Sequence, residues 1–306
     1  MKRQTWIIVA VVAVAVVLCL CLCAAVAAGY ALFAGSGSRV SDAISTQIDV
    51  GAGAPLRVVN PVGDVTVETG TEGLITVQAR REVGGFLNLG TRDQLDNIQV
   101  QAATRGGRAV VEVVIPQPLR QRSAKVDLTL TVPPGTDLDI DSPVGQVHIV
   151  GTRGNVRVRG DVGDVILHDV TVPKSCDVQN NVGAIRFQGR LPQGEGEVLL
   201  RTDVGEVEVA VPEGSAFALD AETSVGDVSS GFELAGRQAG QGDGVTGQWL
   251  RGYANGQGNG VRLVLRTGTG DIDIKLTPCL VIPMGKRATL SSPWVGIAGQ
   301  GGGSRV

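Results

Sequence analysis

The stretch SPVGQVHIVGTRGNVRVRGDVGDVILHDV, residues 142–170, decides the fold, because it holds two copies of a phrase that the whole chain repeats. In each copy a glycine precedes a mostly short, polar residue and a run of alternating apolar residues. The copies are NPVGDVTV (60–67), SPVGQVHI (142–149), GDVGDVIL (160–167), NNVGAIRF (180–187), TDVGEVEV (202–209), TSVGDVSS (223–230) and TGTGDIDI (267–274). Their glycines are 82, 18, 20, 22, 21 and 44 residues apart. A period of about 20 residues with one strand-like phrase is typical of stacked β architectures.

In six of the seven copies, the residues two and four positions after the glycine are apolar, and the residue between them is mostly polar; in the copy at 223–230 the second of these positions is Ser230. Val147 and Ile149, for example, flank His148. Such alternation places one face of a strand in the core and the other toward solvent. Aromatic residues make up only 3% of the chain and glycine occurs 44 times, which suits β-branched strands joined by tight corners. We therefore predict an all-β fold: a right-handed parallel β-solenoid or β-roll with coils of about 20 residues.

An N-terminal transmembrane helix is expected to precede this fold. Residues 6–28 carry no charge and follow Lys2 and Arg3. Such a run is long enough to span a bilayer, and the basic residues mark its cytoplasmic side. A cleavable signal peptide is the alternative, with Ala25-Val26-Ala27 as its cleavage site, although the apolar run is longer than a signal usually has. We predict a single-pass cell-membrane protein whose C-terminal domain lies outside the cytoplasm.

Composition divides the chain into four parts. Residues 1–34 form a cytoplasmic stub and transmembrane anchor (or signal peptide), and residues 35–44 form a linker that begins with Gly-Ser-Gly-Ser. Residues 45–276 form the repeat domain. Residues 277–306 form a C-terminal tail that we expect to be partly disordered.

Charge and cysteine content limit the possible partners. The formal net charge is −3 without a basic stripe, which argues against nucleic-acid binding. Cys176 and Cys279 are the cysteines of the exported part. They could form a disulfide in an oxidising compartment or remain separate, and their spacing of about 100 residues leaves both alternatives open.

A column of acids is the strongest candidate for metal chemistry. Directly after the repeat glycines stand Asp64, Asp164, Glu206, Asp227 and Asp271. Stacked carboxylates could bind calcium. However, Gln146 and Ala184 interrupt the column, and a short polar residue beside a glycine corner commonly accepts local backbone hydrogen bonds. We therefore predict a structural role for the acids, without a metal site or a cofactor.

The glycine-rich segment 231–260 is expected to be a loop, and it carries Trp249 and Tyr253. The two aromatic residues could form an interaction tip, or they could anchor the loop on the end of the stack. The exported part has no nucleophile elbow, phosphate-binding loop ahead of a helix, or CxxC zinc pair. We predict no catalytic residues and no enzyme activity.

Three stretches resemble the bacterial putative adhesin domain family. They are KVDLTLTVPPGTDLDI (125–140), the opening stretch 142–170, and GVRLVLRTGTGDIDIKL (260–276). The resemblance covers about residues 45–276. It implies a β-helical or β-roll ectodomain, often tethered to the envelope, and supplies no catalytic residues.

Three hypotheses for the function follow. The first is a non-enzymatic, membrane-anchored surface adhesion or interaction module, which binds an unidentified envelope or extracellular protein or glycan. The alternative is an envelope-stress or signalling accessory protein that contacts other membrane proteins. The third is a degenerate polysaccharide-active enzyme, because polysaccharide-cleaving β-helices also have coils of about 20 residues.

Overall fold

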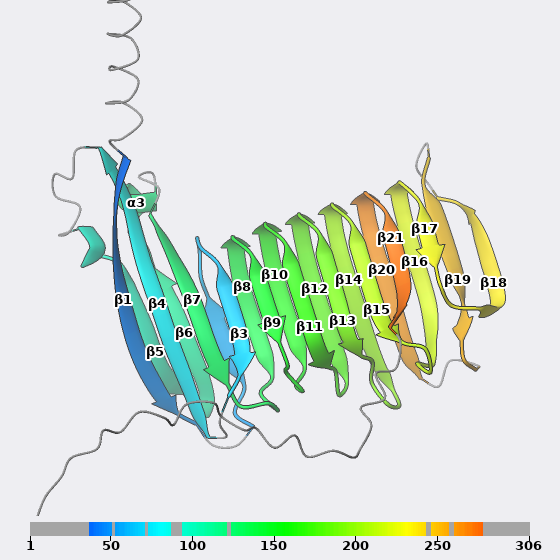
Figure 1. Ribbon diagram of the computed structural model, residues 1–306, viewed down its shortest axis with the longest axis horizontal. Helices are drawn as coiled ribbons and strands as arrows, with labels where there is room; N and C mark the ends of the chain where they lie inside the picture. Colours follow the sequence, from blue (N-terminus) through cyan, green and yellow to red (C-terminus); the bar gives the residue numbers. More distant parts are fainter. Residues whose placement is uncertain are drawn as a thin grey trace, which may run out of the picture.

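The computed structural model describes residues 37–50, 53–70, 73–86, 94–120, 124–242, 246–256 and 260–277. In this part of the chain, the strands form two long sheets that face each other around one apolar core (Figure 1). The all-β prediction is confirmed. The described part also contains one short helix, α3 (Gln117–Arg120), between β6 and β7.

The strands of each sheet lie in an order that differs from their order in the sequence. In spatial order, the 10-stranded sheet, sheet A, contains β1 (Gly37–Asp49), β4 (Leu74–Phe86), β7 (Lys125–Val132), β3 (Val65–Thr69), β9 (Val147–Val150), β11 (Val165–Thr171), β13 (Ile185–Arg190), β15 (Val207–Pro212), β21 (Ile272–Thr277) and β17 (Val228–Ser230). The 11-stranded sheet, sheet B, contains β18 (Leu234–Gln241), β19 (Gln248–Ala254), β16 (Phe217–Val225), β20 (Val261–Thr269), β14 (Gly196–Val204), β12 (Ser175–Val182), β10 (Val156–Val162), β8 (Leu138–Val144), β2 (Leu56–Val59), β6 (Arg108–Val114) and β5 (Gln99–Arg105).

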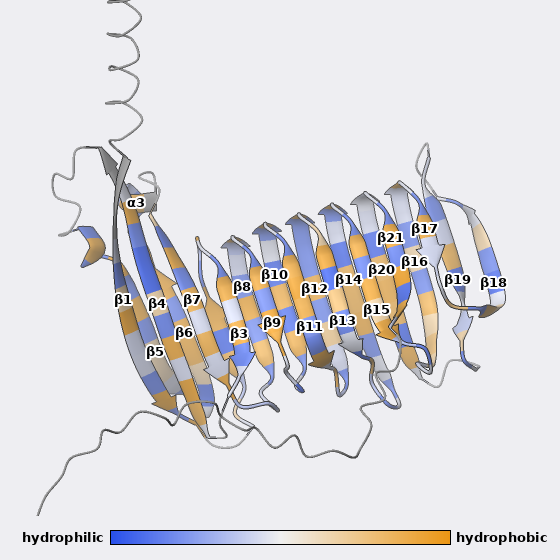
Figure 2. Ribbon diagram, in the orientation of Figure 1, coloured by the Kyte–Doolittle hydropathy of each residue, from blue (hydrophilic) through white to orange (hydrophobic). Residues whose placement is uncertain are grey.

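The central strands pair in parallel and in register, apart from a shift between His168 and Val170 where β11 pairs with β13. In sheet B, Val158 of β10 lies between Ile140 of β8 and Val178 of β12, and all three side chains are buried. In sheet A, Leu167 of β11 lies likewise beside Phe187 of β13. Figure 2 shows the result as apolar bands that cross neighbouring strands at the same level. The core therefore runs the length of the stack, one layer for each repeat.

Glycine forms the corner at which the chain passes from sheet B to sheet A. The repeat glycines lie in one column, in the spatial order Gly63, Gly145, Gly163, Gly183, Gly205, Gly270 and Gly226, with φ between 127° and 149°. A Cβ on Gly183 would lie 2.0 Å from the carbonyl oxygen of Gly163, and the other members of the column meet their neighbours at about the same distance. No side chain fits in this space, and the positive φ favours glycine as well.

The predicted right-handed parallel β-solenoid or β-roll is wrong, because both sheets are mixed. At one end, β1 pairs antiparallel with β4, β4 with β7, and β5 with β6. At the other end, β19 pairs antiparallel with β16 and β18. The glycine phrase describes only the parallel middle of the sheets. The strands β1, β4, β5, β18 and β19 are not part of the repeat, so the period contained no information about their direction.

The order of the rungs also departs from the order of the sequence. β20 lies between β14 and β16, and β21 lies between β15 and β17. The last copy of the phrase is thus inserted between the fifth and sixth copies. The segment expected to be a loop at 231–260 contains instead the strands β18 and β19, which extend sheet B beyond β16.

Several sequence predictions fall on residues that the structure does not describe. The predicted transmembrane segment 6–28 lies outside the described residues, as does most of the tail 277–306. Among the described residues, no helix is both long enough and apolar enough to cross a membrane.

The glycine column yields a prediction for stability. Gly183→Ala should lower the free energy of unfolding by about 3–5 kcal/mol, because the new methyl group meets a backbone carbonyl at a positive φ. Gly135→Ala is the matched control, since a Cβ at Gly135 would find nothing within 4 Å. It should change stability by less than about 1 kcal/mol. Urea unfolding followed by circular dichroism measures both, and equal effects would contradict the role of the column.

Candidate functional site

The candidate interaction tip is the outer face of β19, at one end of sheet B. Trp249, Arg251 and Tyr253 alternate along this strand, so their side chains share one face. Arg251 lies over the Trp249 ring at 5.2 Å from its centre, as in a cation–π contact. Tyr253 is 45% exposed. The three side chains thus form a continuous aromatic and cationic surface, which we call the tip.

Small residues on the neighbouring strand β18 make room for the two rings. A Cβ on Gly240 would lie 2.8 Å from Trp249 Nε1, so the indole packs directly over the bare backbone of Gly240. Gly236, with φ of 62°, lies beside the Tyr253 ring, where a Cβ would meet the ring at an ordinary contact distance of 3.8 Å. The glycine-rich composition of this segment therefore serves to seat the aromatic side chains on a hairpin. The sequence had suggested only a loop.

Asp220, on the neighbouring strand β16, holds Arg251 in place. Arg251 Nε donates to Asp220 Oδ1 at 3.0 Å, and Arg266 donates to Asp220 Oδ2 at 2.8 Å. Partial burial would raise the pKa of Asp220, but the hydrogen bonds and positive charges of Arg266 and Arg251 outweigh it and hold that pKa below its ordinary value. The arginine is thus oriented before any partner binds. Trp, Tyr and Arg are the residues that most often dominate binding energy at protein interfaces.

The acid column has a structural use that the geometry makes explicit. Asp64 Oδ1 accepts a hydrogen bond from the Gln146 backbone N–H at 2.8 Å, and Asp164 Oδ1 accepts one from Ala184 at 2.9 Å. Asp271 Oδ1 accepts another from the Asp227 backbone N–H at 2.9 Å. Each of these carboxylates therefore binds a backbone amide of the adjacent rung. Gln146 and Ala184, which interrupt the column in the sequence, are donors in this arrangement.

Calcium provides a direct test of this interpretation. Because these carboxylates already accept backbone hydrogen bonds, adding millimolar calcium should leave the melting temperature unchanged. Removing one of them, in Asp164→Ala, should lower the free energy of unfolding by about 1–2 kcal/mol. Differential scanning calorimetry with calcium and with magnesium measures the first effect. A rise in melting temperature specific to calcium would contradict the structural role.

The sequence analysis missed a second set of polar residues, inside the same corner. Three positions before each glycine stands a small or polar residue, and several of these are buried: Asn60, Ser142, Asn180, Thr202, Thr223 and Thr267. Asn180 Nδ2 donates to the Gly163 carbonyl at 2.7 Å, and Thr202 Oγ1 donates to the Gly183 carbonyl at 3.0 Å. These side chains stabilise the corner from within. Their common position relative to the glycine was the signal that could have found them.

The sequence analysis also missed a line of exposed valines. The residue directly before the glycine is Val62, Val144, Val162, Val182, Val204 or Val225 in six copies, and Thr269 in the seventh. If the alternation of the preceding strand continued, this residue would lie in the core, as Val178 and Asn180 do before Val182. The corner turns the chain instead, so that Val144, Val162, Val182, Val204 and Val225 are 44–52% exposed. We call these five residues the valine ridge.

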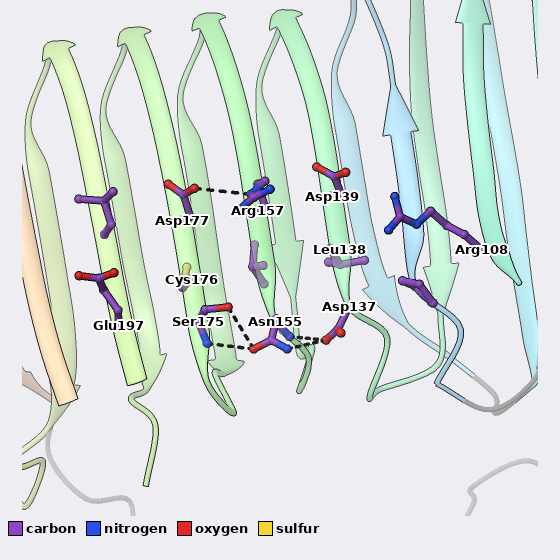
Figure 3. Close-up of a pocket in the computed structure, with 13 residues that line it drawn as sticks. Arg108, Asp137, Leu138, Asp139, Asn155, Arg157, Ser175, Cys176, Asp177 and Glu197 are labelled. Carbon is purple, nitrogen blue, oxygen red and sulfur yellow. Dashed lines mark hydrogen bonds and ion pairs between the residues drawn. The ribbon is translucent and has the colours of Figure 1, made fainter. Parts of the chain in front are cut away.

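A shallow groove of about 470 Å³ crosses the beginnings of β8, β10, β12 and β14 (Figure 3). Its polar side chains bind one another. The Asn155 backbone N–H donates to Asp137 Oδ1 at 2.8 Å, and the Ser175 backbone N–H donates to Asn155 Oδ1 at 2.9 Å. Arg157 forms an ion pair with Asp177 at 3.5 Å. The groove is thus lined by a ladder that ties adjacent rungs together.

Cys176 stands between Ser175 and Asp177, which line this groove, but its own side chain is buried in the core. The thiol is free and 1% exposed, and burial raises its pKa to about 12. A thiol of this kind is protonated at neutral pH and is a poor nucleophile. Cys279 lies outside the described residues, so both alternatives, a disulfide with Cys176 and two separate thiols, stay open.

The raised pKa of Cys176 makes stability depend on pH. Above the unfolded value of 9.0 the unfolded chain loses the thiol proton, whereas the folded chain keeps it until about pH 12. The wild type should therefore lose up to about 1.4 kcal/mol of stability per pH unit in this range, relative to Cys176→Ala. Denaturant titrations of both proteins between about pH 8 and pH 10.5 measure the difference. Parallel pH profiles would contradict the buried, protonated thiol.

Comparisons with known proteins find two solved structures that match most of the chain at low sequence identity. No protein-family model and no curated protein matches the chain. A crystal structure named "putative cell adhesion protein", from Clostridium sporogenes, has 14% sequence identity and a TM-score of 0.43, and covers 77% of this chain and 100% of its own. One named "putative adhesin", from Bacteroides fragilis, has 15% identity and a TM-score of 0.37, and covers 76% of this chain and 96% of its own.

Proposed function

We propose that the protein is a non-enzymatic surface interaction module of adhesion type, anchored in the cell membrane by its N-terminal segment. The tip carries the partner-binding contacts. The observation that carries the proposal is the preformed surface of Trp249, Arg251 and Tyr253 at the end of the sheets. The partner is an envelope or extracellular protein or glycan.

The placement of the tip relative to the N-terminus supports this proposal. β1, which follows the predicted anchor and takes up most of the predicted linker 35–44, is the first strand of sheet A, whereas β18 and β19 lie at the opposite end of the stack (Figure 1). The ten strands of sheet A extend over about 43 Å at an interstrand spacing of about 4.8 Å. A membrane anchor ahead of β1 would thus leave the tip at the far end of a spacer. Hydrogen bonds between all neighbouring strands of the sheet hold that spacer together along its length.

Retention of proteoliposomes tests the role of the tip. Vesicles that carry the full-length protein should be retained on immobilised fragments of the bacterial envelope. The double variant Trp249→Ala and Tyr253→Ala should reduce this retention about thirtyfold or more, since an interface hot spot contributes about 2 kcal/mol or more. The matched control is Thr104→Ala, an exposed position on β5 at the other end of sheet B.

Two outcomes would contradict the proposal. Equal retention of the wild type and the double variant would exclude the tip as the binding surface. Release of soluble sugars from the envelope fragments, followed in the same experiment, would contradict the non-enzymatic role. Unchanged melting temperatures for both variants are the check that they are folded.

A further inference from the structure

The valine ridge is an apolar surface without a role in the tip or the core. Val162 stands in register with Val144 on one side and Val182 on the other, and Val182 stands in register with Val204. These valines and Val225 are five of the eight large apolar side chains that are exposed in the described part of the chain. Apolar side chains that gather on one line of a surface, rather than being scattered, are typical of an interaction site.

Carboxylates border the ridge on both sides. The positions one residue before and two residues after the ridge valines and their equivalents in the other copies carry Asp161, Asp203, Asp64, Asp164, Glu206, Asp227 and Asp271. None of these positions carries a lysine or an arginine in any copy of the phrase. Arginines approach two of the acids, Asp164 at 3.7 Å from Arg186 and Asp203 at 3.4 Å from Arg201. The ridge therefore suits an apolar segment with basic residues nearby.

This charge pattern argues against a second copy of the protein packed ridge against ridge. Such a dimer would bring the two rows of carboxylates from each copy together, and like charges placed in this way repel. The occupant must instead be cationic, or at least lack acidic groups.

We propose that the C-terminal segment Trp294–Ala298 of the same chain binds along the valine ridge. Beyond Thr277 the sequence contains Lys286, Arg287 and Arg305 and neither aspartate nor glutamate. It also contains the apolar run Trp294-Val295-Gly296-Ile297-Ala298. Both properties complement the ridge and its acidic borders.

The reach of the chain distinguishes this run from the other apolar run of the tail, at 280–284. Thr277 ends β21 at the opposite end of the strand from the glycine corner, and β21 itself spans about 17 Å. Leu280 lies only three residues beyond Thr277, a reach of about 10 Å, whereas Trp294 lies 17 residues beyond it, a reach of more than about 50 Å. Only the later run has enough chain before it for all of its residues to reach the corner.

The length of the run fits as well. Five extended residues span about 17 Å, and four rungs of the stack span about 14 Å. The segment can therefore lie across the rungs of Val144, Val162, Val182 and Val204, with Lys286 and Arg287 preceding it beside the acids.

Site-specific photo-crosslinking in the full-length protein tests the proposal. p-Benzoylphenylalanine in place of Val182 should form an intramolecular cross-link to a peptide that contains Trp294, identified by mass spectrometry. The matched control carries the same group at Gln188, which is exposed on β13 of the same coil but lies on the outer face of sheet A. Reversing the charges in Lys286→Glu and Arg287→Glu should reduce the cross-link yield about fivefold, because two exposed ion pairs are lost.

The remaining outcomes overturn the proposal. Cross-links to a second copy, to another protein or to lipid would each assign the ridge to a different occupant. Equal labelling of the tail from positions 182 and 188 would show that the tail has no preferred site. If the substitution at Val182 lowers the melting temperature, the same group at Val204 provides the measurement. Because the tip is not involved, the result is independent of the retention experiment.

Discussion

The backbone contact between successive repeat glycines is the constraint on which the rest of the structure depends. At each corner, the carbonyl of one glycine occupies the place where a Cβ of the next would lie, about 2 Å away. The chain can turn there only with a positive φ, and the turn sends the following residues into sheet A. Since every corner rests on the one before, the column fixes the register of both sheets at once. This explains why the parallel strands pair without a shift over most of the stack.

Hydrogen bonds complete the corner from both sides. From inside, Asn180, Thr202, Thr223 and Thr267 donate to glycine carbonyls in the column. From outside, carboxylates next to the glycines accept backbone N–H groups of the adjacent rung. A buried backbone group without a partner costs about 1–3 kcal/mol, so these side chains stabilise the corners at which they stand. Asp64, Asp164 and Asp271, three of the acids that first suggested a calcium site, thereby have a structural use.

The tip and the valine ridge, the two surfaces proposed to bind other segments or partners, consist of side chains that the stacked core does not bury. The tip stands on antiparallel strands beyond the last rung, where β18 and β19 cover the open edge of β16. An uncovered edge would be a site for unwanted strand pairing, so the hairpin both protects the sheet and carries the aromatic residues. The valine ridge follows the corner itself, because the residue before each glycine is turned outward. Both surfaces thus arise from the geometry of the stack.

The sequence by itself determined the β class, the apolar positions and the glycine corners, because alternation and period are local properties that each rung repeats. It also singled out Trp249 and Tyr253. It did not predict that they lie on a hairpin, or that Trp249 packs against the backbone of Gly240. Only the tertiary structure decided the mixed character of the sheets and the insertion of β20 and β21 before β16 and β17. Strand direction at the ends and the spatial order of rungs depend on contacts between residues far apart in the chain. The outward turn of Val182 and its equivalents likewise follows from the stacked glycines, and a pattern of alternation within one strand cannot show it.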